Sequence, residues 1–191
     1  HFVMYLKELL SEKYGEKTLE QGGLKIYSTI DIEKQKIAEE AIKNRVEENA
    51  SKYNANNAAL VAIDPKNGQI LAMVGSKDYF NQEIDGQVNV AIRPRQPGSS
   101  LKPLVYATLF ARGGYNPETI LYDVVTNFSA SGQAYEPRNY NNQEYGPIAI
   151  KKALAGSLNV PAVKAIYLAG INNVINLAKE AGYTTLNDPE R

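Results

Sequence analysis

The stretch AALVAIDPKNGQILAMVG, residues 58–75, constrains the fold of this chain more strongly than any other segment. Two apolar runs flank the segment from Asp64 to Gly68, and an Asn-Gly pair between such runs is a strong β-hairpin signal. Both runs are nearly continuous in apolar residues, so we expect both faces of the hairpin to be covered. The rest of the chain must therefore supply helices that pack on this hairpin.

The residues before the hairpin supply two helices and a strand. Residues 2–14 place apolar side chains at helical spacing, and residues 22–30 alternate in the manner of a strand. Asp31 is suited to cap a helix over residues 32–53. The buried face predicted for that helix consists of Ile37, Ala41, Ile42 and Val46.

The residues after the hairpin alternate between irregular segments and helices. Residues 75–98 are rich in Gly and Pro and predict a loop, and residues 99–112 predict a helix closed by a Gly-Gly pair. Residues 115–146 are rich in Tyr, Asn, Gly and Pro and predict a long irregular excursion, a kind of loop that is usually functional. Three short helices follow, with a break at Ser157–Asn159. The expected fold class is α+β, with helices packed on a small antiparallel sheet.

Composition excludes several kinds of chemistry. The chain has no Cys, which rules out a thiolate nucleophile and a cysteine zinc site, and its one His, His1, leaves no histidine triad. It carries 21 basic and 21 acidic residues, so charge gives no reason to expect nucleic acid as a partner. Acid–base catalysis therefore has to use Lys, Tyr, Asp or Glu.

Two short motifs are candidates for catalysis: Ser99-Ser-Leu-Lys102 and Ser157-Leu-Asn159. At ordinary usage each pattern is expected about once by chance in a chain of this length, so context decides their weight. Gly98 permits a sharp entry into a helix, and Pro103 is tolerated only in a first turn, so Lys102 is expected near a helix start. Residues three apart share a helix face, so the two side chains of the first motif can meet.

The residue types in these motifs suit acyl transfer. A serine hydroxyl is a weak nucleophile and needs a base, and a Lys with a lowered pKa is the available one. Burial and the positive end of a helix both lower a lysine pKa. A second hydroxyl, Ser157, can relay a proton, and the amide of Asn159 can hold both a substrate carbonyl and the lysine.

The segments RQPGSSLKP, SLNVPAVK, ALVAIDPKNGQILAMVG, GGLKIYSTIDIEKQK and EPRNYNNQEYGPIAIKKALAGSLN, taken together, closely resemble the transpeptidase domain of class A penicillin-binding proteins. That superfamily carries the motif set S-x-x-K, S-D-N and K-T-G. Here the middle position of the second motif is Leu158, which is common enough among penicillin-binding proteins and unlike the Asp of class A β-lactamases. The resemblance runs in order along nearly the whole chain.

The resemblance implies a role for each motif residue. Ser99 would be acylated by the D-alanyl-D-alanine end of a peptidoglycan stem peptide, and equally by β-lactam antibiotics. Lys102 would be its general base, Ser157 would pass a proton to the leaving D-alanine, and Asn159 would bind the substrate amide. An amine from a second stem peptide would then resolve the acyl-enzyme into a cross-link. Neither a cofactor nor a metal is expected.

The resemblance also implies a wider organisation. Residues 1–22 would end an inter-domain linker, and residues 23–191 would form the N-terminal part of the transpeptidase domain. No K-T-G occurs in the sequence, so we expect this piece alone to be inactive and poorly stable. A second chain that carries the remainder would be its partner. The parent protein would also carry a glycosyltransferase domain and an anchor, at the extracytoplasmic face of the bacterial membrane.

Two other functions stay open at this level. A serine β-lactamase would need a Glu-activated water in an E-x-x-x-N pattern, and residues 160–191 contain none. A non-turnover penicillin-sensing or peptidoglycan-binding module is not excluded by the residues. Within the irregular segment, substrate-groove candidates are Tyr135, Asn139, Tyr140 and Tyr145, although a self-stabilised surface loop explains these residues about as well.

Overall fold

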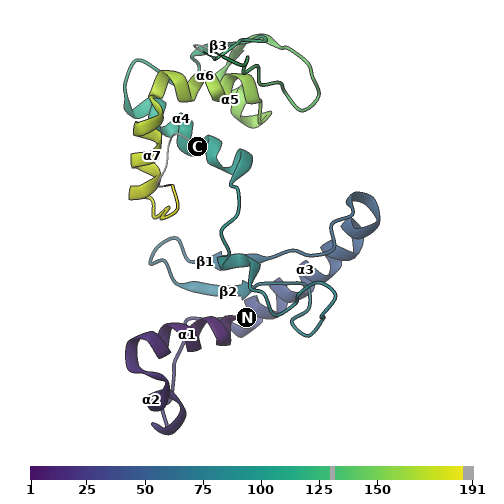
Figure 1. The fold of residues 1–191 in the computed structure, drawn as a ribbon, viewed down its shortest axis with the longest axis vertical. Coiled ribbons are helices and arrows are strands. Elements are labelled where there is room, and N and C mark those ends of the chain that lie inside the picture. The colour runs from purple at the N-terminus through teal and green to yellow at the C-terminus, as the bar shows by residue number, and fades with distance from the viewer. Residues whose placement is uncertain (130–131, 187–191) are drawn as a thin grey trace. The chain divides into compact units, whose positions relative to one another are not determined.

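The structure is a computed structural model that describes residues 1–129 and 132–186. The chain divides into two compact units, residues 1–94 and residues 95–191, and each is described by itself (Figure 1). No helix in the described part of the chain is both long enough and apolar enough to cross a membrane.

The first unit is built on the predicted hairpin and one long helix. Strands β1 and β2 pair antiparallel, with Leu60 opposite Val74 and Ala62 opposite Ala72. Gly68 closes the turn with a φ of 74°, in the left-handed region that glycine adopts without strain. The elements of this unit are α1 (Phe2–Tyr14), α2 (Glu16–Gln21), α3 (Ile32–Tyr53), β1 (Leu60–Ile63), β2 (Ile70–Val74) and the 3₁₀ helix η1 (Val90–Ile92).

Helix α3 covers one face of the hairpin and forms the core of this unit. The α3 side chains in this core are Ala38, Ile42 and Val46, and they pack against Leu60, Ala62, Ala72 and Val74. The prediction that both faces would be covered is wrong for β1, because Val61 is 38% exposed and Ile63 is 55% exposed. On β2, by contrast, Met73 on the opposite face is buried.

The buried face predicted for α3 is half correct. Ile42 and Val46 are buried, but Ile37 is 67% exposed and Ala41 is exposed too. The face of α3 that meets the sheet consists of residues 38, 42 and 46, which are spaced four apart. A residue one position before or after a member of this row points its side chain outward. Apolar periodicity alone did not distinguish Ile37 from its neighbour Ala38.

The segment predicted as a strand at residues 22–30 contains no strand. Only its end meets β2, where the Thr29 hydroxyl donates to the Ile70 carbonyl at 2.6 Å and the N–H of Asp31, just after the segment, donates to the Leu71 carbonyl at 3.0 Å. Leu24 and Ile26 are about half exposed, so their alternation is not matched by a buried face. Without ladder pairing along its length, the segment remains irregular.

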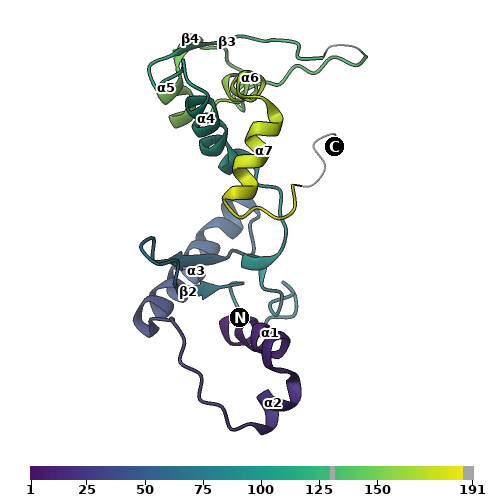
Figure 2. The ribbon, with the colours of Figure 1, turned by 90° about the vertical axis from the view of Figure 1, so that its left-hand side faces the viewer.

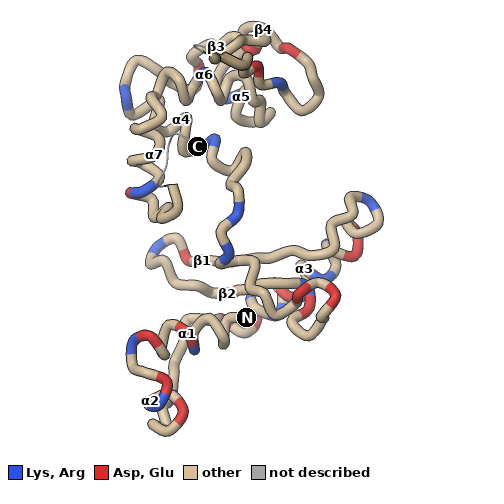
Figure 3. Tube along the Cα trace, in the orientation of Figure 1, with Lys and Arg blue, Asp and Glu red and all other residues tan. Residues whose placement is uncertain are grey.

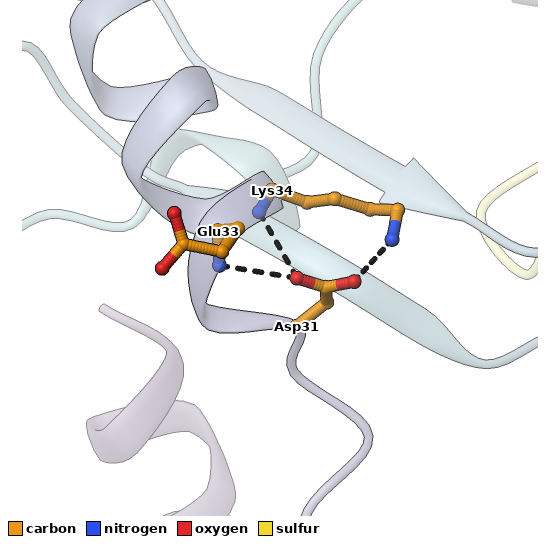
Figure 4. Close-up of polar contacts among 3 residues, drawn as sticks. All are labelled: Asp31, Glu33 and Lys34. Carbon is orange, nitrogen blue, oxygen red and sulfur yellow. Dashed lines mark hydrogen bonds and ion pairs between the residues drawn. The ribbon is translucent and has the colours of Figure 1, made fainter.

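Asp31 caps α3 as the sequence predicted. Its Oδ1 accepts hydrogen bonds from the N–H groups of Glu33 and Lys34, both at 3.1 Å, and its other oxygen pairs with the Lys34 ammonium (Figure 4). These bonds to Lys34 hold the pKa of the Asp31 carboxyl below its usual value. The outer surface of α3 carries charges of both signs, including the Lys36–Glu33 and Arg45–Glu48 pairs (Figure 3).

The second unit packs helices on a second small hairpin. Strands β3 and β4 pair antiparallel, with Leu121 opposite Ile148, so the segment 115–146 is not wholly irregular as predicted. Each strand has only four residues. An alternation of apolar and polar residues over so short a run does not stand out among the Tyr, Asn and Gly residues that surround it. The elements are η2 (Gly98–Leu101), α4 (Lys102–Ala111), β3 (Ile120–Asp123), β4 (Gly146–Ala149), α5 (Ile150–Ala155), α6 (Asn159–Ala169) and α7 (Ile171–Glu180).

Helix α4 is the centre of the second unit. Its buried side chains Val105, Tyr106 and Leu109 meet residues from β3, α5, α6 and α7, and Figure 2 shows α6 and α7 beside α4. Ala162, Ala165 and Ala169 give α6 a face of small residues, which lets the two helices approach closely. The α+β prediction is confirmed, with two separate two-stranded sheets rather than one.

The two isoleucines on α3 provide a matched test of its packing. Ile42→Ala removes a buried side chain from the hairpin core and should lower the free energy of unfolding by about 2–5 kcal/mol. Ile37→Ala makes the same chemical change on the exposed face and should alter it by less than about 0.5 kcal/mol. Urea denaturation measures both, and equal losses would contradict the packing described for α3.

Candidate active site around Lys102

The first motif lies where a short 3₁₀ turn runs directly into α4. The α-helix begins at Lys102 rather than at Ser99, because Gly98–Leu101 forms η2, with Gly98 at a φ of 52°. Pro103 stands at the start of α4, where a missing N–H does no harm. The predicted helix start is thus correct to within one turn.

The two serines of this motif differ in their hydrogen bonding. The Ser100 hydroxyl donates to the Pro97 carbonyl at 2.5 Å and so serves the turn. The Ser99 side chain is exposed, and its hydroxyl forms no hydrogen bond within the described residues. Its oxygen is therefore free to meet a substrate.

The lysine amine is buried among oxygen atoms of the second motif. Lys102 is only 8% exposed, and its Nζ donates to the Ser157 carbonyl at 2.5 Å, to Ser157 Oγ at 3.1 Å and to Asn159 Oδ1 at 2.8 Å. An ammonium has three N–H donors, and these three acceptors match them. The structure thus brings together Lys102, Ser157 and Asn159, and it places Ser99 three residues before the lysine, without a hydrogen bond between the two.

A tight helix ending explains how Ser157 presents two oxygens to one lysine. The Ser157 N–H donates to the Leu154 carbonyl and the Leu158 N–H to the Ala153 carbonyl, which is the Schellman pattern at the end of α5. That pattern requires a left-handed residue, and Ser157 adopts it with a φ of 49°. A non-glycine residue in this region is strained, and such strain concentrates at functional sites.

Asn159 is held in place by the segment just before β4. Its N–H donates to Asn139 Oδ1 at 2.8 Å, and its Nδ2 donates to the Arg138 carbonyl at 2.8 Å. Asn139 in turn donates through Nδ2 to both carboxylate oxygens of Asp123, at 3.0 and 2.8 Å. Asp123 is fully buried at the end of β3.

Burial shifts the pKa values of two groups on α4 in opposite directions. It lowers the pKa of the Lys102 amine, because taking an ammonium out of water favours the neutral form. One turn further on, burial and then the negative charge of Asp123 raise the pKa of Tyr106 to about 12. The Tyr106 hydroxyl is buried and has no hydrogen-bond partner within the described residues.

The sequence did not indicate every residue of this network. Asp123 and Tyr106 were missed, since a single Asp ending a short strand and a single Tyr in a helix carry no local signal. Of the groove candidates, Asn139 belongs to the network, whereas Tyr135, Tyr140 and Tyr145 are exposed. Tyr140 and Tyr145 line a hollow of about 330 Å³ beside Ser157. Among the described residues no cluster of His, Asp or Glu is arranged to hold a metal ion.

Chemically, the arrangement offers an exposed hydroxyl and a buried amine. The amine has a lowered pKa and lies beside a second hydroxyl and an amide oxygen. An amine that loses a proton easily can act as a general base near neutral pH. An adjacent hydroxyl can carry that proton onward. The set is suited to forming and breaking acyl bonds.

Comparisons with known proteins bear on the family to which this chain is similar. The family described as the penicillin binding protein transpeptidase domain matches residues 58–190. Penicillin-binding protein 2D of Bacillus subtilis is 37% identical over 183 residues, and penicillin-binding protein 1B of Vibrio cholerae is 38% identical over 172 residues. These alignments cover 92% and 86% of this chain, but only 25% and 21% of those relatives. The chain therefore spans a quarter or less of their length.

Solved structures give the same fold. Penicillin-binding protein 1A of Haemophilus influenzae superposes with a TM-score of 0.60 at 31% identity, covering 66% of this chain and 19% of that one. PonA1 of Mycobacterium tuberculosis, in complex with penicillin V, superposes with a TM-score of 0.69 over 93% of this chain and 45% of that one. At 23% identity the latter likeness concerns the fold alone.

The raised pKa of Tyr106 predicts how stability depends on pH. Its folded pKa of about 12 lies above the ordinary tyrosine value of 10.0, so its contribution to stability is fully present below pH 10 and is lost as pH rises towards 12. Lys102, whose pKa is lowered, acts in the opposite direction and makes stability rise with pH just below 10.5. The difference in the pH dependence of the unfolding free energy between the unchanged chain and Tyr106→Phe isolates the contribution of the tyrosine.

Tyr106→Phe should therefore remove part of the fall in unfolding free energy between pH 10 and pH 11. At pH 7 it should be nearly neutral or slightly stabilising, because it removes a buried hydroxyl that has no hydrogen-bond partner within the described residues. Tyr167→Phe is the control, since Tyr167 is 80% exposed. Identical alkaline unfolding curves for the unchanged chain and Tyr106→Phe would contradict the burial described for this phenol.

Proposed function

Because this chain belongs to the penicillin-binding protein transpeptidase family, we propose that it serves a D-alanyl-D-alanine transpeptidase that cross-links peptidoglycan stem peptides through a serine acyl-enzyme. The observation that carries this proposal is the buried Lys102 amine. It lies within hydrogen-bonding distance of Ser157 and Asn159 and three residues after an exposed Ser99.

Acylation is the first step. The Ser99 oxygen attacks the carbonyl carbon of the penultimate D-alanine, and its proton passes to neutral Lys102. The peptide C–N bond then breaks, and the leaving D-alanine amine takes a proton from Lys102 through the Ser157 hydroxyl. In the structure all three N–H groups of the lysine are directed at Ser157 and Asn159. Neutral Lys102 therefore needs its lone pair turned towards Ser99, and the lowered pKa of the amine favours that neutral form.

Deacylation completes the cycle. The amine of a second stem peptide attacks the ester carbon and gives a proton to neutral Lys102. A new amide forms, the ester C–O bond breaks, and the leaving Ser99 oxygen takes that proton from Lys102. Throughout this scheme the side-chain amide oxygen of Asn159 accepts a hydrogen bond from Lys102. The hollow beside Ser157, lined by Tyr140, Tyr145 and Lys152 among others, offers polar and aromatic surface for a peptide.

The wider organisation is part of the proposal. Residues 1–22 would form the end of a linker and residues 23–191 the N-terminal part of the transpeptidase domain. The protein would work at the extracytoplasmic face of the bacterial membrane, with stem peptides and β-lactams as ligands. A second chain would supply the K-T-G strand if the same chain does not, and a glycosyltransferase domain would complete a bifunctional parent. The aligned segments make up only 25% and 21% of penicillin-binding proteins 2D and 1B, so these relatives have room for further domains.

Covalent labelling by a fluorescent penicillin tests the nucleophile. The chain, expressed with whatever sequence naturally flanks it, should gain the mass of one penicillin at Ser99. Ser99→Ala should lose the labelling, and Lys102→Ala should slow it about 10²–10⁴-fold, the usual contribution of a general base. Ser100→Ala is the matched control, since it removes the adjacent hydroxyl, and it should label within about tenfold of the unchanged protein. A label mapped to Ser100, or undiminished labelling of Ser99→Ala, would overturn the assignment.

The lifetime of the acyl-enzyme distinguishes the transpeptidase from the other two functions. We expect release of penicillin over hours, because residues 160–191 lack the E-x-x-x-N pattern of a Glu-activated water. We also expect cross-linked dimers when stem peptides are supplied, as detected by mass spectrometry. Release within seconds would indicate a β-lactamase. Stable acylation without any cross-linking by the flanked protein would indicate a sensing or binding module.

A further inference from the structure

We propose that Asp123 and Asn139 form a positioning pair that holds Asn159 against Lys102 and thereby sets the rate of acylation. The inference rests on the proposed function of the site. It deepens that function by assigning a role to two residues that do not themselves touch the reacting atoms.

The pair is buried and firmly bonded. Asp123 is fully buried and Asn139 is 5% exposed. Both carboxylate oxygens of Asp123 accept from Asn139 Nδ2, and Oδ2 also accepts from the Tyr145 N–H at 3.0 Å. Asn139 Nδ2 reaches the Gln143 carbonyl as well, at 2.8 Å. A buried carboxylate is costly unless its oxygens are hydrogen-bonded, so these donors are strongly retained.

The carboxylate decides which way the Asn139 amide points. Carboxylate and carbonyl oxygens only accept, so the side of the amide that faces Asp123 and Gln143 has to be Nδ2. The opposite side is then Oδ1, which accepts from the Asn159 N–H at 2.8 Å. If the amide turned over, Nδ2 would face that N–H, and two donors would oppose each other.

Asn139 thereby caps α6 from twenty positions earlier in the chain. The residue before the helix, Leu158, has no side-chain acceptor, and α6 has no local side-chain cap. Its first N–H group is instead satisfied by Asn139. The carbonyl of the neighbouring Arg138 accepts a hydrogen bond from Asn159 Nδ2, so Asn159 Oδ1 faces Lys102 and accepts from its amine. Two adjacent residues thus fix both the backbone and the side chain of Asn159.

The consequence for catalysis is geometric. The Lys102 amine has one hydrogen-bond acceptor on Asn159 and two on Ser157, and Ser157 lies two positions before Asn159. A shift of α6 that moves Asn159 would therefore also disturb the pocket that orients the base. A misplacement of about 1 Å at a catalytic group can cost roughly 10²-fold in rate.

Asp123→Asn tests the pair with almost no change in shape. The variant places an NH2 donor where a carboxylate oxygen accepts from Asn139 Nδ2, so two donors oppose each other, and we expect penicillin acylation of the flanked protein to fall about 10–100-fold. Asp78→Asn is the matched control, because it makes the same chemical change at an exposed residue of the first unit that does not belong to the Lys102 network. It should label at nearly the unchanged rate.

A double-mutant cycle separates positioning from a general loss of structure. If Asp123 acts through Asn139, then Asp123→Asn should cost less than about threefold when Asn139 is already Ala. Losses that multiply would overturn the inference. Should Asp123→Asn alone fail to fold, Asp123→Asn combined with Asn139→Ala replaces it, since these two changes together leave no buried carboxylate without donors, and the same loss of about 10–100-fold is expected.

Amide hydrogen exchange gives a measurement that does not depend on activity. In Asp123→Asn the Asn159 N–H should exchange at least about tenfold faster, while the Ala165 N–H in the middle of α6 should keep its rate. If the unchanged protein is not acylated at Ser99, the proposed function fails, yet this exchange still tests the pair. An Asn159 amide as protected in the variant as in the unchanged protein would refute the positioning role.

Discussion

The packing of the second unit depends on one buried ammonium, that of Lys102, which needs three hydrogen-bond acceptors. Lys102 lies at the start of α4 with little exposure, and a buried charge without partners would be strongly destabilising. Its acceptors come from a segment more than fifty residues further along the chain. Helices α4 and α6 must therefore pack in one register for the lysine to be satisfied. The small residues on the buried face of α6 make that close packing possible.

The same requirement explains the strained backbone at Ser157. A glycine would enter the left-handed region without cost, but it would offer the lysine a carbonyl and no hydroxyl. Serine offers both oxygens from one position, and the two backbone bonds that end α5 hold it there. The conformational cost is thus tied to the atom that the proposed chemistry uses as a proton relay. The exposed hydroxyl of Ser99, by contrast, is left unbonded within the described residues, which suits the nucleophile role proposed for it.

Local signals in the sequence predicted much of the fold. They also singled out Lys102, Ser157 and Asn159, whose side chains the structure brings together. The Asn-Gly hairpin, the Asp31 cap and the helix over residues 32–53 were all read from neighbouring residues and were confirmed. The strand at residues 22–30 was wrong because alternation indicates a strand only when a partner completes the ladder. Ile37 was wrongly assigned to the core because helical periodicity leaves the direction of the buried stripe uncertain by one position. The short strands β3 and β4 were hidden in a segment whose composition is that of a loop.

By itself, the sequence determined the chemistry that is available to this protein. The absence of Cys, the single His and the two serine motifs narrow the candidate base to Lys102, because these are properties of residue type and local spacing. Only the tertiary structure decided how that base is held. Asp123, Asn139 and Tyr106 acquire their significance from burial and from contacts between residues far apart in the chain. Burial and long-range hydrogen bonding depend on packing, and no short pattern of residues encodes them.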